Sequence, residues 1–167
     1  MTDWVVDTNV AIVANGHPEA GKDNSQPTIA CRLAAVQFLQ SLLKRHVVLL
    51  DSDGAIQTEY RTYLNPAGQP GVGDRFYQTV LHSSPERVRR VDLPKTQTGD
   101  YMDIPNSLIL DGFDPSDRKF VALAHRENAP IANAVDSDWI EHSDTLAAEG
   151  IVVQNLCGSD PAHWFDQ

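Results

Sequence analysis

Short apolar runs alternate with longer segments of helical periodicity along this chain. Apolar runs typical of strands lie at residues 4–6, 46–50, 130–135 and 151–153, and residues 87–93 form either a strand or a basic edge. Helical spacing of apolar side chains is found at residues 28–45, 54–64, 117–124 and 142–149, and a further helix is possible at 75–82. This alternation favours a three-layer α/β/α fold with a mainly parallel central sheet.

Segments rich in Gly and Pro separate these elements. Residues 15–27 and 65–74 are predicted to be surface loops, and residues 94–106 follow no regular pattern. We predict a single domain at residues 1–157, in which residues 65–106 form a longer, partly irregular insertion. Residues 158–167 are predicted to be an irregular C-terminal tail.

Capping residues mark two helix starts. Ser52 and Asp53 are expected to cap the helix at 54–64, whose inner face would carry Ile56, Tyr60 and Tyr63. Asp51 follows a strand and could be a ligand, although capping explains it better. In the second case, Asp114 would be the cap, with Pro115 at the first helical position and Asp117 at the third.

Composition and charge restrict the possible functions. The chain has 167 residues and a formal net charge of -10, which opposes a broad electrostatic grip on nucleic acid. No apolar run approaches the roughly 20 residues of a membrane span, and a secretory signal is missing, so we expect a cytoplasmic protein without a membrane partner. Cys31 is expected to be a buried apolar residue, and a disulfide with Cys157 is not expected in the cytosol.

Four carboxylates lie where separate segments should converge. Asp7 and Asp136 follow apolar strands, whereas Glu59 lies within a helix and Asp117 lies at a helix start. The carboxyl ends of parallel strands form the ligand-binding edge of such sheets. Like charges at 4 Å repel by about 4 kcal/mol per pair at an effective dielectric near 20, so the cluster needs a cation. Oxygen ligands alone favour one or two Mg²⁺ or Mn²⁺ ions and phosphoryl chemistry.

The order of these residues resembles that of the PIN-domain nucleases. Asp7 and Asn9 follow the first strand, and Glu59 lies in the helix after the second. Asp117 opens a helix seven residues before a small residue, Ala124, and Asp136-Ser-Asp138-Trp139 follows a later strand. The chain departs from the family at Ala134, where Thr or Ser is common, and Ser137 or Asn133 could support Asp136 instead.

The resemblance implies a PIN-like fold and a metal-dependent ribonuclease, acting as a toxin or a defence effector. Asp7, Glu59, Asp117 and Asp136 would hold the metal and serve catalysis. Asn9 would orient Asp7 or contact the substrate, and Asp138 would support the site or join a second metal. The remaining expected substrate or outer-sphere groups are Asp114, Arg61, Arg118 and Lys119. Expected partners are RNA rather than DNA, an antitoxin or an ATPase, and possibly a second copy of the chain.

Other interpretations remain open at this stage. The chain could be a non-catalytic PIN-fold interaction subunit or a structure-specific DNA nuclease. A phosphatase of the haloacid-dehalogenase kind needs Asp at the position of Asn9 and a late Lys that this sequence lacks. Asp117 and Asp138 could be helix acids without a catalytic role. The basic run at residues 87–90 is either a solvated edge or a track for a phosphate backbone.

Overall fold

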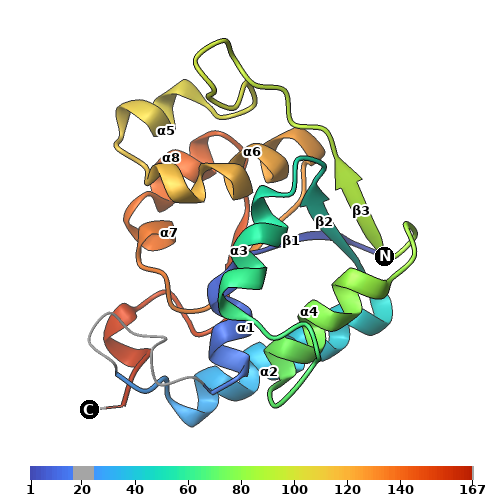
Figure 1. The fold of residues 1–167 in the computed structure, drawn as a ribbon. Coiled ribbons are helices and arrows are strands. Elements are labelled where there is room, and N and C mark those ends of the chain that lie inside the picture. Colours follow the sequence, from blue (N-terminus) through green and yellow to red (C-terminus); the bar gives the residue numbers. More distant parts are fainter. Residues whose placement is uncertain (17–24, 167) are drawn as a thin grey trace.

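A five-stranded parallel sheet forms the centre of the computed structural model, which describes residues 1–16 and 25–166 (Figure 1). Every pairing between neighbouring strands is parallel, and the spatial order is β3-β2-β1-β4-β5. The strands are β1 (Asp3–Val6), β2 (Val47–Asp51), β3 (Val88–Val91), β4 (Ile131–Asn133) and β5 (Val153–Asn155). The predicted α/β class with a parallel sheet is therefore confirmed.

Helices cover both faces of the sheet. One layer contains three helices that pack against one another: α1 (Thr8–Ala14), α2 (Ile29–Arg45) and α4 (Val72–His82). The opposite layer contains α5 (Asn106–Leu110), α6 (Arg118–Glu127), α7 (Asp138–Glu141) and α8 (Ser143–Ala148). Helix α3 (Ala55–Tyr63) contacts both α1 and α6 and so bridges the two layers. None of the helices described is long and apolar enough to cross a lipid bilayer.

The core explains why the apolar runs became strands. Val5 and Val6 of β1 are fully buried, and so is every residue of β2 to within a few per cent. A parallel strand that is covered on both faces needs apolar side chains on both, which removes the alternation of a half-exposed strand. Tyr60 of α3 is also fully buried, and its hydroxyl donates to the carbonyl of Val6 at 2.6 Å. This bond joins α3 to the end of β1.

Three local expectations were wrong. Helix α3 is capped by Asp51, whose carboxylate accepts from the N–H groups of Ala55 and Ile56 at 2.9 Å, and not by Ser52 or Asp53. Gly54 adopts a left-handed φ of 84°, and this turn brings the helix start back over Asp51. Tyr63 is 57% exposed because it lies at the last turn of α3, beyond the core.

The C-terminal elements also differ from the sequence prediction. The helix predicted at 142–149 is divided into α7 and α8, because His142 departs from helical backbone angles. The last strand was predicted at 151–153 but begins at Val153. Gly150 has a left-handed φ of 74°, and the Ile151 N–H closes α8 by donating to the Leu146 carbonyl at 3.0 Å. The backbone of Ile151 is therefore committed to the helix end.

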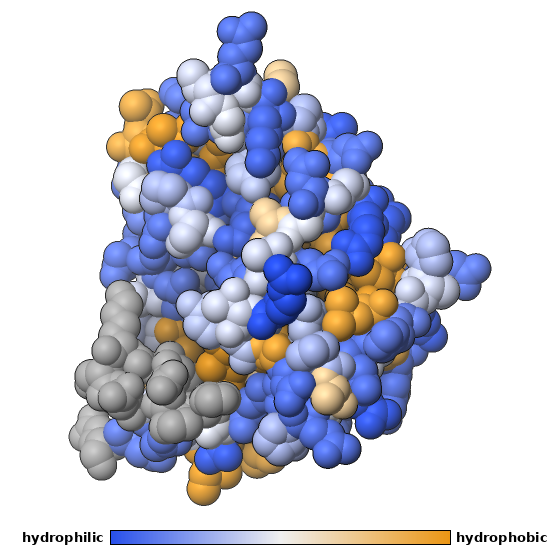
Figure 2. All heavy atoms as spheres, viewed as in Figure 1, coloured by the Kyte–Doolittle hydropathy of each residue, from blue (hydrophilic) through white to orange (hydrophobic). Residues whose placement is uncertain are grey.

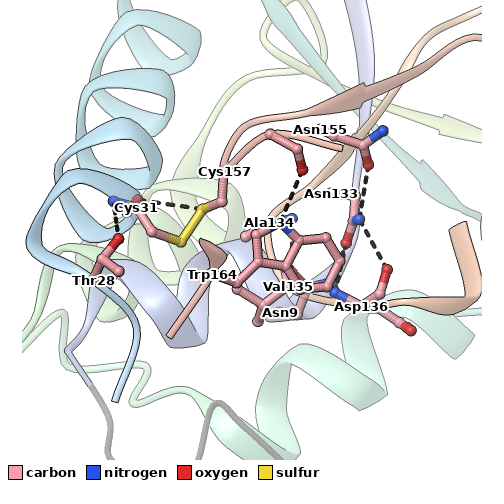
Figure 3. The surroundings of a disulfide bond; sticks show 11 residues. Asn9, Thr28, Cys31, Asn133, Ala134, Val135, Asp136, Asn155, Cys157 and Trp164 are labelled. Carbon is pink, nitrogen blue, oxygen red and sulfur yellow. Dashed lines mark hydrogen bonds between the residues drawn. A yellow bond between two sulfur atoms is a disulfide. The ribbon is translucent and has the colours of Figure 1, made fainter. Parts of the chain in front are cut away.

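A disulfide joins Cys31 to Cys157, contrary to our expectation (Figure 3). The two Cα atoms are 4.7 Å apart, because α2 begins beside the segment that follows β5. The C-terminal segment packs nearby: Trp164 is 1% exposed, and its carbonyl accepts from the Thr28 N–H at 2.9 Å. It contains the short turn η3 (Pro161–His163). The loop predicted at 15–27 lies partly outside the described residues.

Candidate metal centre

Asp7 is the most deeply placed acid at the carboxyl edge of the sheet. It follows β1, caps α1 and is only 4% exposed. One carboxylate oxygen accepts from the Asn9 N–H at 3.1 Å, and the other accepts from the indole N–H of Trp139 at 2.7 Å. Trp139 is fully buried, so its ring fixes the direction of the Asp7 carboxylate.

Asp117 and Asp136 bring two further carboxylates to this point. Asp117 ends the 3-10 turn η2 (Pro115–Asp117) just before α6, and Asp136 follows β4. One carboxylate oxygen from each of Asp7, Asp117 and Asp136 lies within 4.8 Å of the others. Separate strands and a helix start have therefore placed three of the four predicted acids close enough to share one cation.

Burial and mutual repulsion raise the pKa values of two of these acids. The pKa of Asp7 rises from 3.8 to about 7, mainly because burial removes its hydration and secondly because Asp136 is close. The pKa of Asp117 rises from 3.8 to about 9 through burial, with the charges of Asp7 and Asp136 adding to the effect. Both shifts disfavour the ionised state without a counter-ion. An oxygen-only set of this kind fits a hard divalent cation such as Mg²⁺ or Mn²⁺.

A second group of acids overlaps the first. Carboxylate oxygens of Asp114, Asp117 and Asp138 also lie within 4.8 Å of one another. Asp114 is exposed and caps η2 by accepting from the N–H and hydroxyl of Ser116, both at 2.9 Å. These bonds lower the pKa of Asp114, backbone N–H first. Asp114 thus acts as the predicted cap, and it faces the same cavity of about 300 Å³ as Asp117, Asp136 and Asp138.

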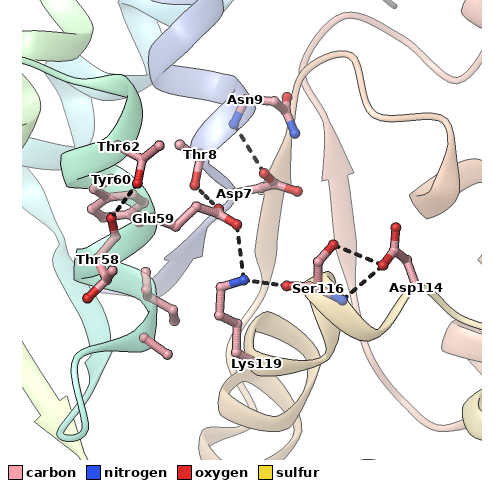
Figure 4. A network of polar contacts seen from close by, with 12 residues as sticks. Asp7, Thr8, Asn9, Thr58, Glu59, Tyr60, Thr62, Asp114, Ser116 and Lys119 are labelled. Carbon is pink, nitrogen blue, oxygen red and sulfur yellow. Dashed lines mark hydrogen bonds and ion pairs between the residues drawn. The ribbon is translucent and has the colours of Figure 1, made fainter.

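Glu59 belongs to neither group and is held by a lysine instead (Figure 4). One of its oxygens accepts from the ammonium of Lys119 at 3.0 Å, and the other accepts from the Thr8 hydroxyl. The Lys119 ammonium also donates to the Ser116 carbonyl, and the lysine side chain is only 12% exposed. The cation beside Glu59 is therefore supplied by the chain itself.

Two asparagines hold the loop that carries Asp136. The Asn9 side-chain oxygen accepts from the N–H groups of Ala134 and Val135 at 2.9 and 3.0 Å. Its amide donates to the Asn133 side chain at 3.0 Å. Asn133 in turn accepts from the Asp136 N–H at 3.1 Å and donates to the Asp136 carbonyl at 3.0 Å. Asn133 is fully buried, so backbone bonds support Asp136 where Ala134 offers no hydroxyl.

The loop has two further attachments. Asn155 of β5 accepts from the Asn133 amide at 2.9 Å, as Figure 3 shows. The Asp138 N–H donates to a carboxylate oxygen of Asp136 at 3.0 Å. Sequence reasoning named Asn133 as one possible support, but it did not find Asn155 or the Trp139 donor. The position of Trp139 directly after Asp138 was the available signal for that aromatic.

The three predicted basic groups have separate surroundings. Lys119 points into the acidic site, as described above. Arg118 is turned to the Phe113 carbonyl, to which its Nη2 and Nε atoms donate at 3.1 and 3.3 Å. Arg61 is exposed and lines a different cavity, of about 540 Å³. Only Lys119 is therefore placed directly beside the acids.

Comparisons with known proteins give little further information. No family model matches the sequence, and no curated protein matches it. A similar solved structure is the crystal structure of VapBC2 from Rickettsia felis bound to a DNA fragment from their promoter. The similarity covers 92% of this chain and 98% of that chain, at 13% identity and a TM-score of 0.47. Similarity at this level assigns neither a family nor a function.

Proposed function

We propose that the protein is a metal-dependent nuclease that hydrolyses phosphodiester bonds, with RNA as its substrate and an acidic centre of the PIN type. The observation that carries this proposal is the convergence of Asp7, Asp117 and Asp136 within 4.8 Å at the carboxyl edge of the parallel sheet. The raised pKa values of Asp7 and Asp117 support it, because they show two groups that a cation would stabilise in the ionised state.

The cation would be held by Asp7, Asp117 and Asp136, with Asp138 and Asp114 placed to hold waters around it. A bound Mg²⁺ or Mn²⁺ ion supplies a water of lowered pKa and neutralises charge on the phosphate. The chain prepares this site in two ways. Trp139 and Asn9 orient the Asp7 carboxylate, and Asn133 fixes the backbone on both sides of Asp136.

Lys119 adds a positive charge that is part of the protein. Its ammonium ties Glu59 to the start of α6, so Glu59 positions the lysine and is not itself among the clustered acids. A lysine at this place can hydrogen-bond a phosphate oxygen that lies next to the acids. Glu59 therefore keeps a place in the site, with a role that differs from direct metal ligation in the predicted set.

The test compares cleavage and metal binding in the same variants. Asp7→Asn, Asp117→Asn and Asp136→Asn should each abolish cleavage of single-stranded RNA with Mg²⁺ or Mn²⁺ and weaken Mn²⁺ binding in calorimetry. Asp100→Asn, an exposed loop acid, is the matched control and should leave both unchanged. A DNA oligonucleotide and a phosphomonoester are run in parallel. Full RNA cleavage by the three variants would contradict the proposal.

The same assays separate the alternatives. A non-catalytic interaction subunit would show no cleavage with any substrate, and a DNA nuclease would cleave only the DNA oligonucleotide. A toxin or defence role, an antitoxin or ATPase partner, a homodimer and a cytoplasmic location form part of the proposal on the strength of the PIN resemblance. Co-purification of the natively expressed protein tests for these partners.

A further inference from the structure

A second cavity lies on the flank of α3 that faces away from the acids. Its volume is about 540 Å³, and it is bounded by α3, α4, β3 and the turn at residues 52–54. Along α3, helical geometry places Gln57, Thr58 and Arg61 on one flank, about 150° around the axis from Glu59. Figure 4 shows the side chains of Thr58 and Glu59 pointing in different directions. The cavity is therefore separate from the acidic site, although the same helix lines both.

Two arginines give this cavity a positive character. Arg61 forms no hydrogen bond or ion pair within the described part of the chain. Arg90 of β3 donates to the Gln57 side chain at 2.7 Å through Nη2, which leaves its other N–H groups available. Asp53 is the single acid that lines the cavity, so the lining has a net charge of +1 in a chain of -10.

The neighbouring arginines are already committed elsewhere. Arg89 forms ion pairs with Asp3 and with Glu127, the latter at 2.9 Å. Arg87 donates to the Lys44 carbonyl at 3.0 Å. Of the basic run at residues 87–90, Arg90 is thus the arginine that faces the cavity with donors to spare. The sequence suggested a basic track, and the structure reduces it to the pair Arg61 and Arg90.

The other lining groups suit a nucleotide. The hydroxyls of Ser52 and Thr58 have no hydrogen-bond partner among the described residues, and they lie in the same cavity as the guanidinium groups. Tyr77 and Leu81 of α4 provide an apolar wall. In the space-filling view, apolar surface is visible between hydrophilic side chains over the region of β2, β3 and α4 (Figure 2). Guanidinium and hydroxyl donors recognise phosphate oxygens, and an apolar wall accommodates a base or sugar.

We propose that this cavity is a subsite for one phosphate-bearing nucleotide of the substrate strand, held by Arg61 and Arg90 on the far side of α3 from the acids. The proposal rests on the proposed nuclease function. A helix with its side chains is about 10 Å wide, so a strand that crosses α3 reaches from the acids to the cavity within a few nucleotides. The subsite provides local phosphate contacts for a protein whose overall charge repels nucleic acid.

The test measures RNA binding by fluorescence anisotropy with Ca²⁺ in place of Mg²⁺. The double variant Arg61→Gln/Arg90→Gln is compared with Arg45→Gln/Arg75→Gln, which removes two exposed arginines that do not line the cavity. For a single-stranded 12-nucleotide RNA, the first variant should bind about tenfold more weakly. Its salt slope should be shallower by about 1.4, at roughly 0.7 per lost phosphate contact. The control should bind like the wild type, and thermal melting checks the fold of both.

Three outcomes are informative. Equal weakening in both double variants would show a general charge effect and overturn the subsite, and unchanged binding in the first variant would do the same. Cleavage of a trinucleotide and Mn²⁺ binding should be unaffected by Arg61→Gln/Arg90→Gln. If these activities persist without any effect on 12-nucleotide binding, the subsite fails while the proposed nuclease function stands. If the wild type neither cleaves nor binds RNA, both proposals fail.

Titration with adenosine monophosphate gives a direct measure of the cavity. Backbone amide signals of Gly54 and Thr58 should shift in the wild type, and the shifts should disappear in the Arg61→Gln/Arg90→Gln variant. Shifts that are confined to residues around Asp7 would contradict a nucleotide in the cavity.

Discussion

Replacing Asp117 with Asn should stabilise the metal-free protein. Asp117 is 8% exposed, and its pKa is raised from 3.8 to about 9 by burial and by the charges of Asp7 and Asp136. Below pH 4 the carboxyl group is protonated in both the folded and the unfolded chain, so it has no effect on stability. Between pH 4 and 9 the unfolded chain loses this proton while the folded protein keeps it. Stability therefore falls as the pH rises through this window.

The magnitude follows from the width of the window. At pH 7 the pH lies about three units above the ordinary pKa, and each unit is worth 1.36 kcal/mol, which gives about 4 kcal/mol as an upper value. Asparagine is neutral at every pH and has nearly the same shape, so it removes this penalty. Relaxation of water and side chains around the charge reduces the gain, and we expect about 1–3 kcal/mol at pH 7.

The assay is urea unfolding in EDTA at pH 5, 6, 7 and 8. Wild-type stability should fall over this range, and Asp117→Asn should show a shallower decline and a higher midpoint at pH 7. Asp114→Asn is the matched control, because Asp114 caps η2 and its pKa is lowered. That variant should lose stability, by about 1 kcal/mol for a weakened cap. If Asp117→Asn were no more stable than the wild type at pH 7 and 8, the account of the acidic cluster would be refuted.

Three further predictions follow from the contacts around the site. Lys119→Met should reduce RNA cleavage by tenfold or more while Mn²⁺ binding measured by calorimetry stays within a few-fold, because Lys119 holds Glu59 and not the clustered acids; a large loss of metal binding would refute this separation. Asn133→Ala should weaken Mn²⁺ binding and lower the unfolding free energy by about 1–3 kcal/mol, since it leaves buried backbone groups of Asp136 unpaired; unchanged calorimetry would contradict it. Reducing the disulfide should lower stability by about 2–4 kcal/mol in urea unfolding, and equal midpoints with and without reductant would show that the bond contributes nothing.

Local pattern was enough to predict the layers of the fold. Apolar runs became β1, β2 and β4, and the alternation with helices specified a parallel sheet because a strand buried on both faces must be apolar throughout. The positions of Asp7 and Asp136 at strand ends followed from the same reasoning, since carboxyl ends of parallel strands share one edge. Asp114 and Pro115 announced the helix start that carries Asp117.

Contacts between distant segments were decided by the tertiary structure alone. The partner of Glu59 is Lys119, sixty positions away, and the donor to Asp7 is Trp139. No periodicity in the sequence encodes which way such side chains point once the helices pack. The disulfide shows the same limit, because composition suggests only the chemical environment, whereas the 4.7 Å approach of Cys31 and Cys157 depends on how α2 meets the end of β5. Sequence fixes the face on which a residue lies, and packing then selects its partner.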